Sequence, residues 1–234
     1  YEEKYYAAGK VLGSRFIKRE TRPTEEATLA ARLIDRAIRP RFDMRMRSEV
    51  QVVATILSID EKNDPDVLAM LGASLALSLS DIPWQGPIAG VRVARKNGEL
   101  ILNPAFEERL GADLDLVIAG TKDRINMCEA GASEVGEDDF LAAAEAGFAA
   151  IRYLITFQET IIRNHAKAKR EVRLLPTPDE LKDVLGREFS ARIEAAVYQK
   201  DKTAMQAVVS ELKTEWLARA AQAHPDLFQK NAAE

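Results

Sequence analysis

Four basic side chains surround an aromatic residue near the start of the chain. The stretch GSRFIKRETRPTEE (residues 13–26) places Phe16 and Ile17 among cations. These cations are Arg15, Lys18, Arg19 and Arg22. Lysine and arginine neutralise backbone phosphates without sequence preference, and an exposed aromatic ring can stack on a nucleic-acid base. The pattern is typical of a binding site for an anionic ligand. A solvated loop whose two apolar side chains point into the core has the same composition.

A second group of cations follows on a predicted helix at residues 25–39. Its arginines are Arg32, Arg36 and Arg39, which we call the arginine stripe. At 100° per residue they lie within about 60° of one another, and the stripe is roughly 10 Å long. The apolar residues on the opposite side are Ala30, Leu33, Ile34, Ala37 and Ile38. Three guanidinium groups at that reach suit a row of phosphates, but pairing with the nearby Glu25 and Asp35 is the open alternative.

The carboxylates form no convincing catalytic set. The candidates are Asp60, Asp64, Asp66, Asp113 and Asp115. NDPD at residues 63–66 could bind a metal, but it also makes an ordinary turn and helix start. DLD at residues 113–115 opens a predicted strand and is expected to be solvated. No Walker or GxGxxG loop is present, and neither Cys128 nor His165 has an evident catalytic partner. From the residues alone we therefore assign no catalytic residue and no metal-binding residue. The pattern predicts an anion-binding surface.

Charge is unevenly distributed along the 234 residues. The net charge is −4, yet residues 1–50 have a balance of about +4, so attraction for polyanions is expected there. The single cysteine excludes an internal disulfide. No apolar run reaches the roughly 18 residues of a membrane span, and no secretory signal is visible. Because the chain also begins at Tyr1, we expect a segment of a longer cytoplasmic protein without a membrane partner.

Hydrophobic periodicity predicts an α+β fold. Strands are predicted at residues 49–59, 88–95, 99–102, 114–121 and 125–130. Helices are predicted at residues 25–39, 65–80 and 137–169. Beyond Pro176 and Pro178 the strand pattern ends, and helices are predicted at residues 178–186, 188–198 and 201–222. We expect a β-sheet domain with packed helices over residues 1–170 and a small all-helical domain over residues 171–234.

Long motifs in a fixed order carry a family resemblance. They are YAAGK, GSRFIKRETRPTEE, ARLIDRAIRPRF, EVQVVATILSIDEKNDPDVLAMLGASLALSLSDIPWQGPIAGVRV, GELILNP and LDLVIAGTKD. Together they resemble the bacterial polynucleotide phosphorylase (polyribonucleotide nucleotidyltransferase) family, densely over about residues 1–130 and more loosely to the C-terminus. Motifs of this length in this order are highly specific.

The resemblance implies an RNase PH-like (ribosomal protein S5 domain 2-like) fold followed by an all-helical domain. Members of the family form homotrimeric rings. They degrade single-stranded RNA from its 3′ end with inorganic phosphate, release nucleoside diphosphates and can run in reverse. The segment is similar to most of the first RNase PH-like domain, without its opening strands, and to the helical domain. The Mg²⁺ site and the catalytic residues of the family belong to a second RNase PH-like domain, expected after Glu234. RNA-degradation complex proteins are further expected partners.

The resemblance also assigns the basic residues. FIKRE matches the channel loop of the family, which implies RNA-binding roles for Phe16, Lys18 and Arg19, with Arg22 in the RP that follows. The arginine stripe matches a helix that faces anions near the RNA path. Two departures are Arg15, which is an extra residue in the loop, and Ala37, where proline is usual.

A third departure concerns catalysis. NDPD stands where the second domain of the family has a serine-rich phosphate-binding turn, and its carboxylates would repel phosphate. The segment is therefore expected to lack the catalytic site. A non-catalytic RNA-binding scaffold and a structural domain whose arginines form intersubunit ion pairs are the two alternatives.

Overall fold

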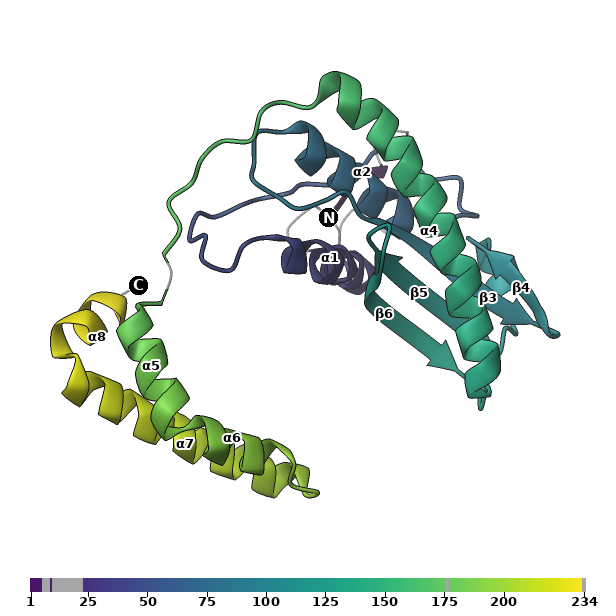
Figure 1. The fold of residues 1–234 in the computed structure, drawn as a ribbon. Helices are drawn as coiled ribbons and strands as arrows, with labels where there is room; N and C mark the ends of the chain where they lie inside the picture. Colours follow the sequence, from purple (N-terminus) through teal and green to yellow (C-terminus); the bar gives the residue numbers. More distant parts are fainter. Residues whose placement is uncertain (6–8, 10–22, 176, 233–234) are drawn as a thin grey trace, which may run out of the picture. The chain divides into compact units, whose positions relative to one another are not determined.

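The computed structural model describes all residues except 6–8, 10–22, 176 and 233–234. The chain forms two compact units, Tyr1–Arg173 and Leu174–Glu234, which are described separately below (Figure 1). The first unit combines a β-sheet with helices, and the second is helical in its described part.

The main sheet has four antiparallel strands in the order β4-β3-β5-β6. The strands are β3 (Ala89–Lys96), β4 (Glu99–Leu102), β5 (Leu114–Gly120) and β6 (Ile125–Ala132). Asn97 and Gly98 connect β3 to β4 with φ values of 54° and 83°, the left-handed conformation that a tight hairpin turn requires. Both predicted strand pairs are confirmed.

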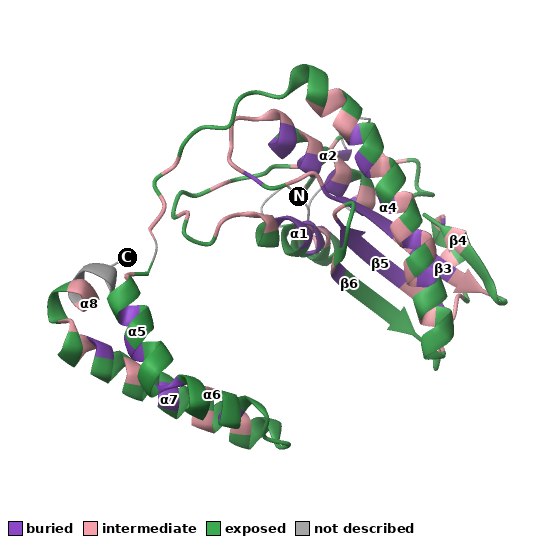
Figure 2. Cartoon of the chain, in the orientation of Figure 1, coloured by how far each residue is buried: buried purple, intermediate pink, exposed green. Residues whose placement is uncertain are grey.

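Helices cover both faces of this sheet. They are α1 (Glu25–Ile38), α2 (Asp66–Leu79) and α4 (Glu137–His165), and the short α3 (Phe106–Arg109) follows β4. Side chains alternate across a strand, so Leu116 and Ile118 of β5 pack against α4. Val117 and Ala119 face the other way and join the core beneath α1 and α2. Figure 2 shows the resulting buried centre of β5 between exposed outer helix faces.

A buried polar triangle ties three elements of this unit together. The Ser74 hydroxyl of α2 donates to Gln158 Oε1 of α4 at 2.8 Å and accepts the Ile88 backbone N–H at 3.0 Å. Gln158 Nε2 donates to the Ile88 carbonyl at 2.8 Å. Ser74 and Gln158 are both fully buried. Every hydrogen-bonding group in the triangle is thus satisfied by another member.

The predicted buried strand at residues 49–59 is wrong. Only β2 (Thr55–Ile56) is a strand here, and it pairs in parallel with β1 (Glu2–Glu3). Val53 and Leu57 are each 56% exposed. The β-branched composition favours a strand, but a strand also needs a neighbour, and among the described residues β1 offers only two positions.

The predicted helix at residues 137–169 ends earlier than expected, at His165. The Lys167 N–H donates to the Leu79 carbonyl beyond α2 instead of continuing the helix. Within the described residues α4 alone is long and apolar enough to cross a membrane. Gly147, Ile151 and Ile155 pack against the sheet, so one face of α4 belongs to the core of this unit while most of the helix surface is exposed.

The second unit contains α5 (Asp179–Glu188), α6 (Ser190–Val197), α7 (Lys202–Ala223) and α8 (Pro225–Ala232). The first three helices were predicted, and α8 was not. Val184, Phe189, Ala196 and Leu212 form its small core. This unit begins three residues later than the predicted boundary at residue 171.

Candidate nucleic-acid interface

Four of the predicted RNA-binding residues lie outside the described part of the chain. They are Phe16, Lys18, Arg19 and Arg22. Their assignment to a channel loop therefore stays a prediction. The structure does describe the helix that follows this loop, and with it the rest of the predicted interface.

Helix α1 presents the arginine stripe as its sequence predicts. The Thr24 side chain accepts the Ala27 N–H at 3.0 Å and caps the helix, and Glu25 and Glu26 favour its N-terminal end electrostatically. The buried residues of α1 are Ala27, Leu33, Ile34, Ala37 and Ile38. The opposite, arginine-bearing side is exposed to solvent.

Two arginines of the stripe already hold carboxylates. Arg39 donates to Asp35 one turn earlier, at 2.6 Å, and this pairing raises the pKa of Arg39. Arg36 forms an ion pair with Glu129 of β6 and donates to the Cys128 carbonyl at 3.3 Å. Arg32 is exposed and has no ion pair with any described residue. The alternative of internal pairing therefore holds for Arg36 and Arg39 but not for Arg32.

The loop after α1 contains both arginines that are paired within the fold and an arginine that is exposed and unpaired among the described residues. Arg41 Nε donates to the Gln85 carbonyl at 2.8 Å and fixes the loop. Arg45 pairs with Asp43 at 2.6 Å, and the hydrogen bonds from Arg45 lower the pKa of Asp43 to about 2. Arg47 is exposed and, like Arg39, lines a hollow of about 890 Å³ between the end of α1 and residues 42–54. The stripe thus borders a concave surface.

A second charged group lies on the α2 side of the sheet, and we call it the charged cluster. Its members are Asp64, Asp66, Arg92, Arg109 and Asp115. Arg92 of β3 binds Asp66 at 2.6 Å and Asp115 at 2.9 Å. Arg109 of α3 binds Asp115 at 2.9 Å and Asp64 at 3.2 Å.

The predicted solvation of DLD at residues 113–115 is wrong. Asp115 belongs to the charged cluster, and Asp113 on the other face binds Arg95 at 2.7 Å. Sequence reasoning also missed Arg92, which stands between the fully buried Val91 and Val93. A charged residue inside an apolar strand was the signal, because it needs a partner of opposite charge.

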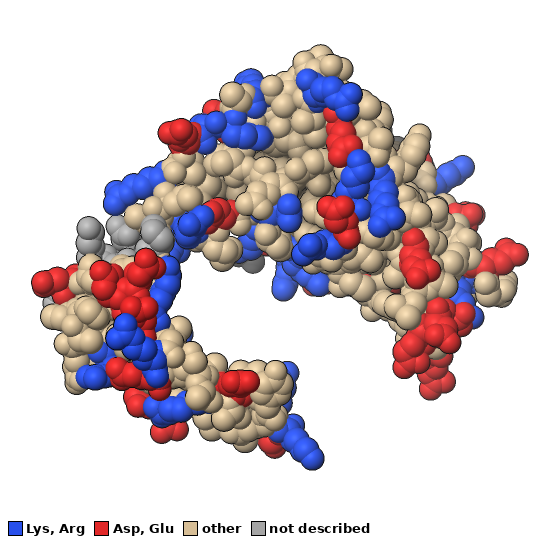
Figure 3. Space-filling view, in the orientation of Figure 1, with Lys and Arg blue, Asp and Glu red and all other residues tan. Residues whose placement is uncertain are grey.

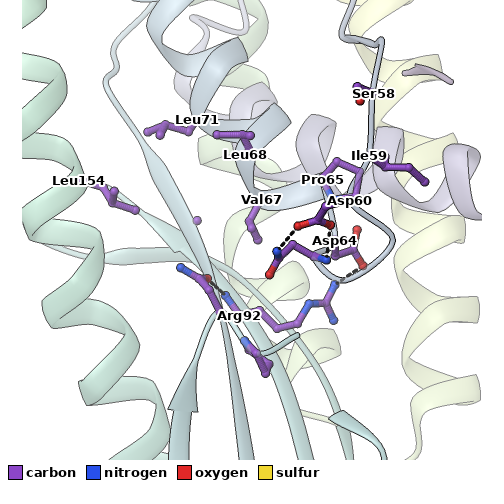
Figure 4. Close-up of a pocket in the computed structure, with 14 residues that line it drawn as sticks. Ser58, Ile59, Asp60, Asp64, Pro65, Val67, Leu68, Leu71, Arg92 and Leu154 are labelled. Carbon is purple, nitrogen blue, oxygen red and sulfur yellow. Dashed lines mark hydrogen bonds and ion pairs between the residues drawn. The ribbon is translucent and has the colours of Figure 1, made fainter. Parts of the chain in front are cut away.

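Beside the charged cluster lies a pocket of about 600 Å³ (Figure 4). Its polar lining includes Asp60, Asn63, Asp64 and Arg92, and Leu68 belongs to its apolar wall. Asp60 accepts the Asn63 and Lys62 backbone N–H groups, which lower the pKa of Asp60 to about 2 and close the turn at residues 60–63 that leads into NDPD. Burial raises the pKa of the Asp66 carboxyl in spite of Arg92.

This pocket fits neither a bound phosphate nor Mg²⁺. A phosphate would meet the carboxylates of Asp60 and Asp64, which line the pocket beside Arg92. A Mg²⁺ ion requires free oxygen ligands, but Asp60 already accepts two backbone N–H groups and Asp64 accepts a hydrogen bond from the Arg109 guanidinium group. Within the described residues no group of three or more His, Cys, Asp or Glu side chains is arranged to hold a metal.

Two matched family models fit this architecture. Residues 1–83 match the 3′ exoribonuclease family, domain 1, and residues 86–150 match the 3′ exoribonuclease family, domain 2. The chain belongs to the 3′ exoribonuclease family. The expected enzyme family and the RNase PH-like α+β fold class are confirmed by this membership.

Individual members of the 3′ exoribonuclease family match almost the whole chain. It is 47% identical to polyribonucleotide nucleotidyltransferase from Enterococcus faecalis, over 91% of this chain and 30% of that protein. Identity is 49% for the same enzyme from Streptococcus gordonii, over 91% of this chain and 29% of that protein. The chain thus spans about 30% of the length of these curated relatives. The solved structure of rice (Oryza sativa) Rrp46 aligns with a TM-score of 0.48 and 15% identity, over 61% of this chain and 68% of that one.

Proposed function

We propose that the chain is the RNA-holding and trimer-forming part of a cytoplasmic, phosphate-dependent 3′-to-5′ exoribonuclease. The observation that carries this proposal is the identity of 47–49% with polyribonucleotide nucleotidyltransferases over 91% of the chain. The parent enzyme would release nucleoside diphosphates from single-stranded RNA and could polymerise them in reverse. RNA-degradation complex proteins are its proposed further partners.

Basic side chains hold the RNA in this proposal. Phe16 stacks on a base, while Lys18, Arg19 and Arg22 neutralise phosphates. The arginine stripe continues the track on α1. Arg32, which has no carboxylate partner among the described residues, contacts phosphate directly. Arg36 and Arg39 exchange Glu129 and Asp35 for phosphate only when RNA is bound.

Phosphorolysis itself belongs to the rest of the parent protein in this proposal. Inorganic phosphate is the co-substrate, and Mg²⁺ supplies charge neutralisation at a site outside this chain. The NDPD turn, which by resemblance stands where the second domain of the family has a phosphate-binding turn, supports this division, since its Asp64 and Asp66 are carboxylates of the charged cluster.

The chain by itself is expected to show no phosphorolysis. Incubation with poly(A), inorganic phosphate and Mg²⁺ should release no nucleoside diphosphate above a blank without protein, because neither a phosphate site nor a metal site is assigned to it. The full-length parent is the positive control. Phosphate- and Mg²⁺-dependent release by the chain alone would overturn the proposed division of labour.

Replacing the two loop cations should weaken RNA binding by the full-length parent. For Lys18→Ala with Arg19→Ala, the slope of log affinity against log salt should become less negative by about 1.4, since each lost phosphate contact on a single strand contributes about 0.7. The measurement is a salt titration of labelled poly(A) binding.

The matched control removes two exposed cations elsewhere, Lys200→Ala with Lys202→Ala. This control should leave both the affinity and the slope unchanged. If the loop variant behaves like the control, the loop does not hold RNA.

The pairs Arg36–Glu129 and Arg39–Asp35 favour a second candidate, a structural domain that binds no RNA. In that case the salt slope of the parent would not respond to the loop variant, and replacing Arg36 or Arg39 would lower the stability of the first unit and leave the affinity for RNA unchanged. A non-catalytic RNA-binding scaffold predicts the loop effect without phosphorolysis by the parent chain. The complete reading frame beyond Glu234 separates that scaffold from the enzyme.

A further inference from the structure

A second strongly basic stretch follows α4, far in sequence from the N-terminal cations. Residues 163–173 read RNHAKAKREVR, with five Lys or Arg against one carboxylate, Glu171. We call this stretch the basic strap. It begins in the last turn of α4 and continues without regular secondary structure to the end of the first compact unit. Figure 3 shows Lys and Arg side chains along the surface where the chain leaves α4.

Some of its groups fix the strap to the unit. The backbone N–H groups of Lys167 and Arg170 donate to the Leu79 and Asp81 carbonyls at 3.0 and 2.8 Å. Lys169 Nζ donates to the carbonyls of three residues at the C-terminal end of α2, which are Leu77, Ser78 and Ser80, at 2.9, 3.1 and 2.7 Å. The Arg170 side chain binds Asp81 at 2.8 Å. The path of the strap is therefore held by α2 and the residues after it.

The other cations of the strap form no ion pair with a described residue, although Arg170 and, to a smaller extent, Lys167 lower the pKa of Asp81. Arg163, Lys167 and Arg173 are exposed, and none has an ion pair or side-chain hydrogen bond to a described residue. The strap thus separates its cations into two sets: Lys169 and Arg170 anchor it, whereas the other three face solvent.

The spacing of the free cations suits one strand of nucleic acid. The six steps along the backbone from Lys167 to Arg173 span at most about 20 Å in an extended chain, at roughly 3.3 Å per residue. Arg163 extends the row along the end of α4. A single file of cations on a fixed backbone follows a phosphate chain, since the anchors have already removed much of the conformational freedom that binding would otherwise restrict.

We propose that the basic strap is a second contact for the phosphate backbone of single-stranded RNA, made by Arg163, Lys167 and Arg173. It rests on the proposed function, because the RNA that it holds is the one gripped by the N-terminal loop. Its neighbour Glu171 is the one acidic side chain in the strap and weakens, without cancelling, the positive potential.

The test uses the full-length parent with Arg163→Ala, Lys167→Ala and Arg173→Ala combined. The salt slope of poly(A) binding should become less negative by about 2, and the affinity at physiological salt should fall about tenfold or more. Photo-crosslinking with 4-thiouridine-containing single-stranded RNA should label peptides of residues 163–173 in the unchanged parent. The thermal midpoint should change little, because the three side chains make no hydrogen bond or ion pair with a described residue.

A matched control replaces three exposed lysines of the second unit, Lys200→Ala, Lys202→Ala and Lys213→Ala. It should keep the affinity and slope of the parent. If the strap variant matches this control while the loop variant loses affinity, the strap proposal is wrong and the proposed function stands. If neither variant loses affinity, both are wrong. Binding of the strap to anionic vesicles with unchanged RNA affinity would also overturn the inference.

Discussion

Arg92→Ala is expected to lower the free energy of unfolding by about 3–5 kcal/mol, the range for removing one partner of a buried ion pair. The Arg92 side chain is 11% exposed, and its principal partner Asp66 is 5% exposed as a residue. The substitution leaves Asp66 without its 2.6 Å ion pair and with a carboxylate that water cannot solvate well. Asp115 retains Arg109, so the effect falls chiefly on Asp66. Urea unfolding of the chain, monitored by far-UV circular dichroism, measures it.

The loss in free energy of unfolding caused by Arg92→Ala should become smaller at acidic pH. Burial already raises the pKa of Asp66 above its ordinary value near 3.8, and loss of Arg92 raises it further. A carboxyl group whose folded pKa exceeds its unfolded pKa opposes folding only while it is ionised, so the penalty is complete at neutral pH. It disappears as the pH falls through the folded pKa toward the unfolded one. A deficit that grows in acid would contradict this account.

Two neighbouring variants test whether burial sets the size of the effect. Arg109→Ala removes a half-buried partner whose carboxylates keep Arg92, so a smaller loss of about 1–2 kcal/mol is expected. Arg45→Ala removes an exposed pair and should change stability the least of the three. If Arg92→Ala ranks with Arg45→Ala, the charged cluster does not stabilise the fold.

The elements that sequence predicts well are those whose signals are local. Thr24 caps α1, and Asn97-Gly98 makes the β3–β4 turn, whatever the rest of the chain does. Residues 49–59 fail for the opposite reason, because a strand forms only where another backbone offers hydrogen bonds. The composition of that segment cannot say whether such a backbone is present.

The candidate interface divides in the same way. Helical periodicity was sufficient to place Arg32, Arg36 and Arg39 on the exposed side of α1. The pairing of Arg36 with Glu129 could not be predicted from the sequence. Glu129 is ninety-three positions from Arg36, and only the packing of α1 on β6 brings the two side chains together. The charged cluster was missed because its carboxylates and guanidinium groups come from four separate parts of the chain.

The cations of the chain thus differ by what they contact rather than by type. Arg92 and Arg109 neutralise carboxylates within the fold, and Lys169 binds the carbonyls at the end of α2. Arg32 and Lys167 are exposed and unpaired in the described structure. The second kind can attract a polyanion without first giving up a partner, so a count of basic residues overstates the charge that is immediately available to the proposed RNA-binding surface.

Gln158→Leu is expected to lower the free energy of unfolding by about 2–4 kcal/mol, because it leaves two buried polar groups unpaired at about 1–3 kcal/mol each. These groups are the Ser74 hydroxyl and the Ile88 carbonyl, which Gln158 binds at 2.8 Å each. Leucine nearly conserves the volume, so the loss reports hydrogen bonding rather than a cavity. Because α2, α4 and the residue before β3 meet at this triangle, the damage should reach the core of the first unit.

A double-mutant cycle with Ser74→Ala separates the triangle from simple packing. Ser74→Ala alone removes the acceptor of the Ile88 N–H, at an expected loss of about 1–3 kcal/mol. When Ser74→Ala is combined with Gln158→Leu, it also removes the hydroxyl that Gln158→Leu alone leaves unpaired. The double variant should therefore lose at least about 0.5 kcal/mol less stability than the sum of the two single losses. Gln199→Leu at an exposed position is the matched control and should change stability by no more than about 0.5 kcal/mol. Additive losses would mean that Ser74 and Gln158 act independently, and the triangle would then not be the cooperative link between the two helices.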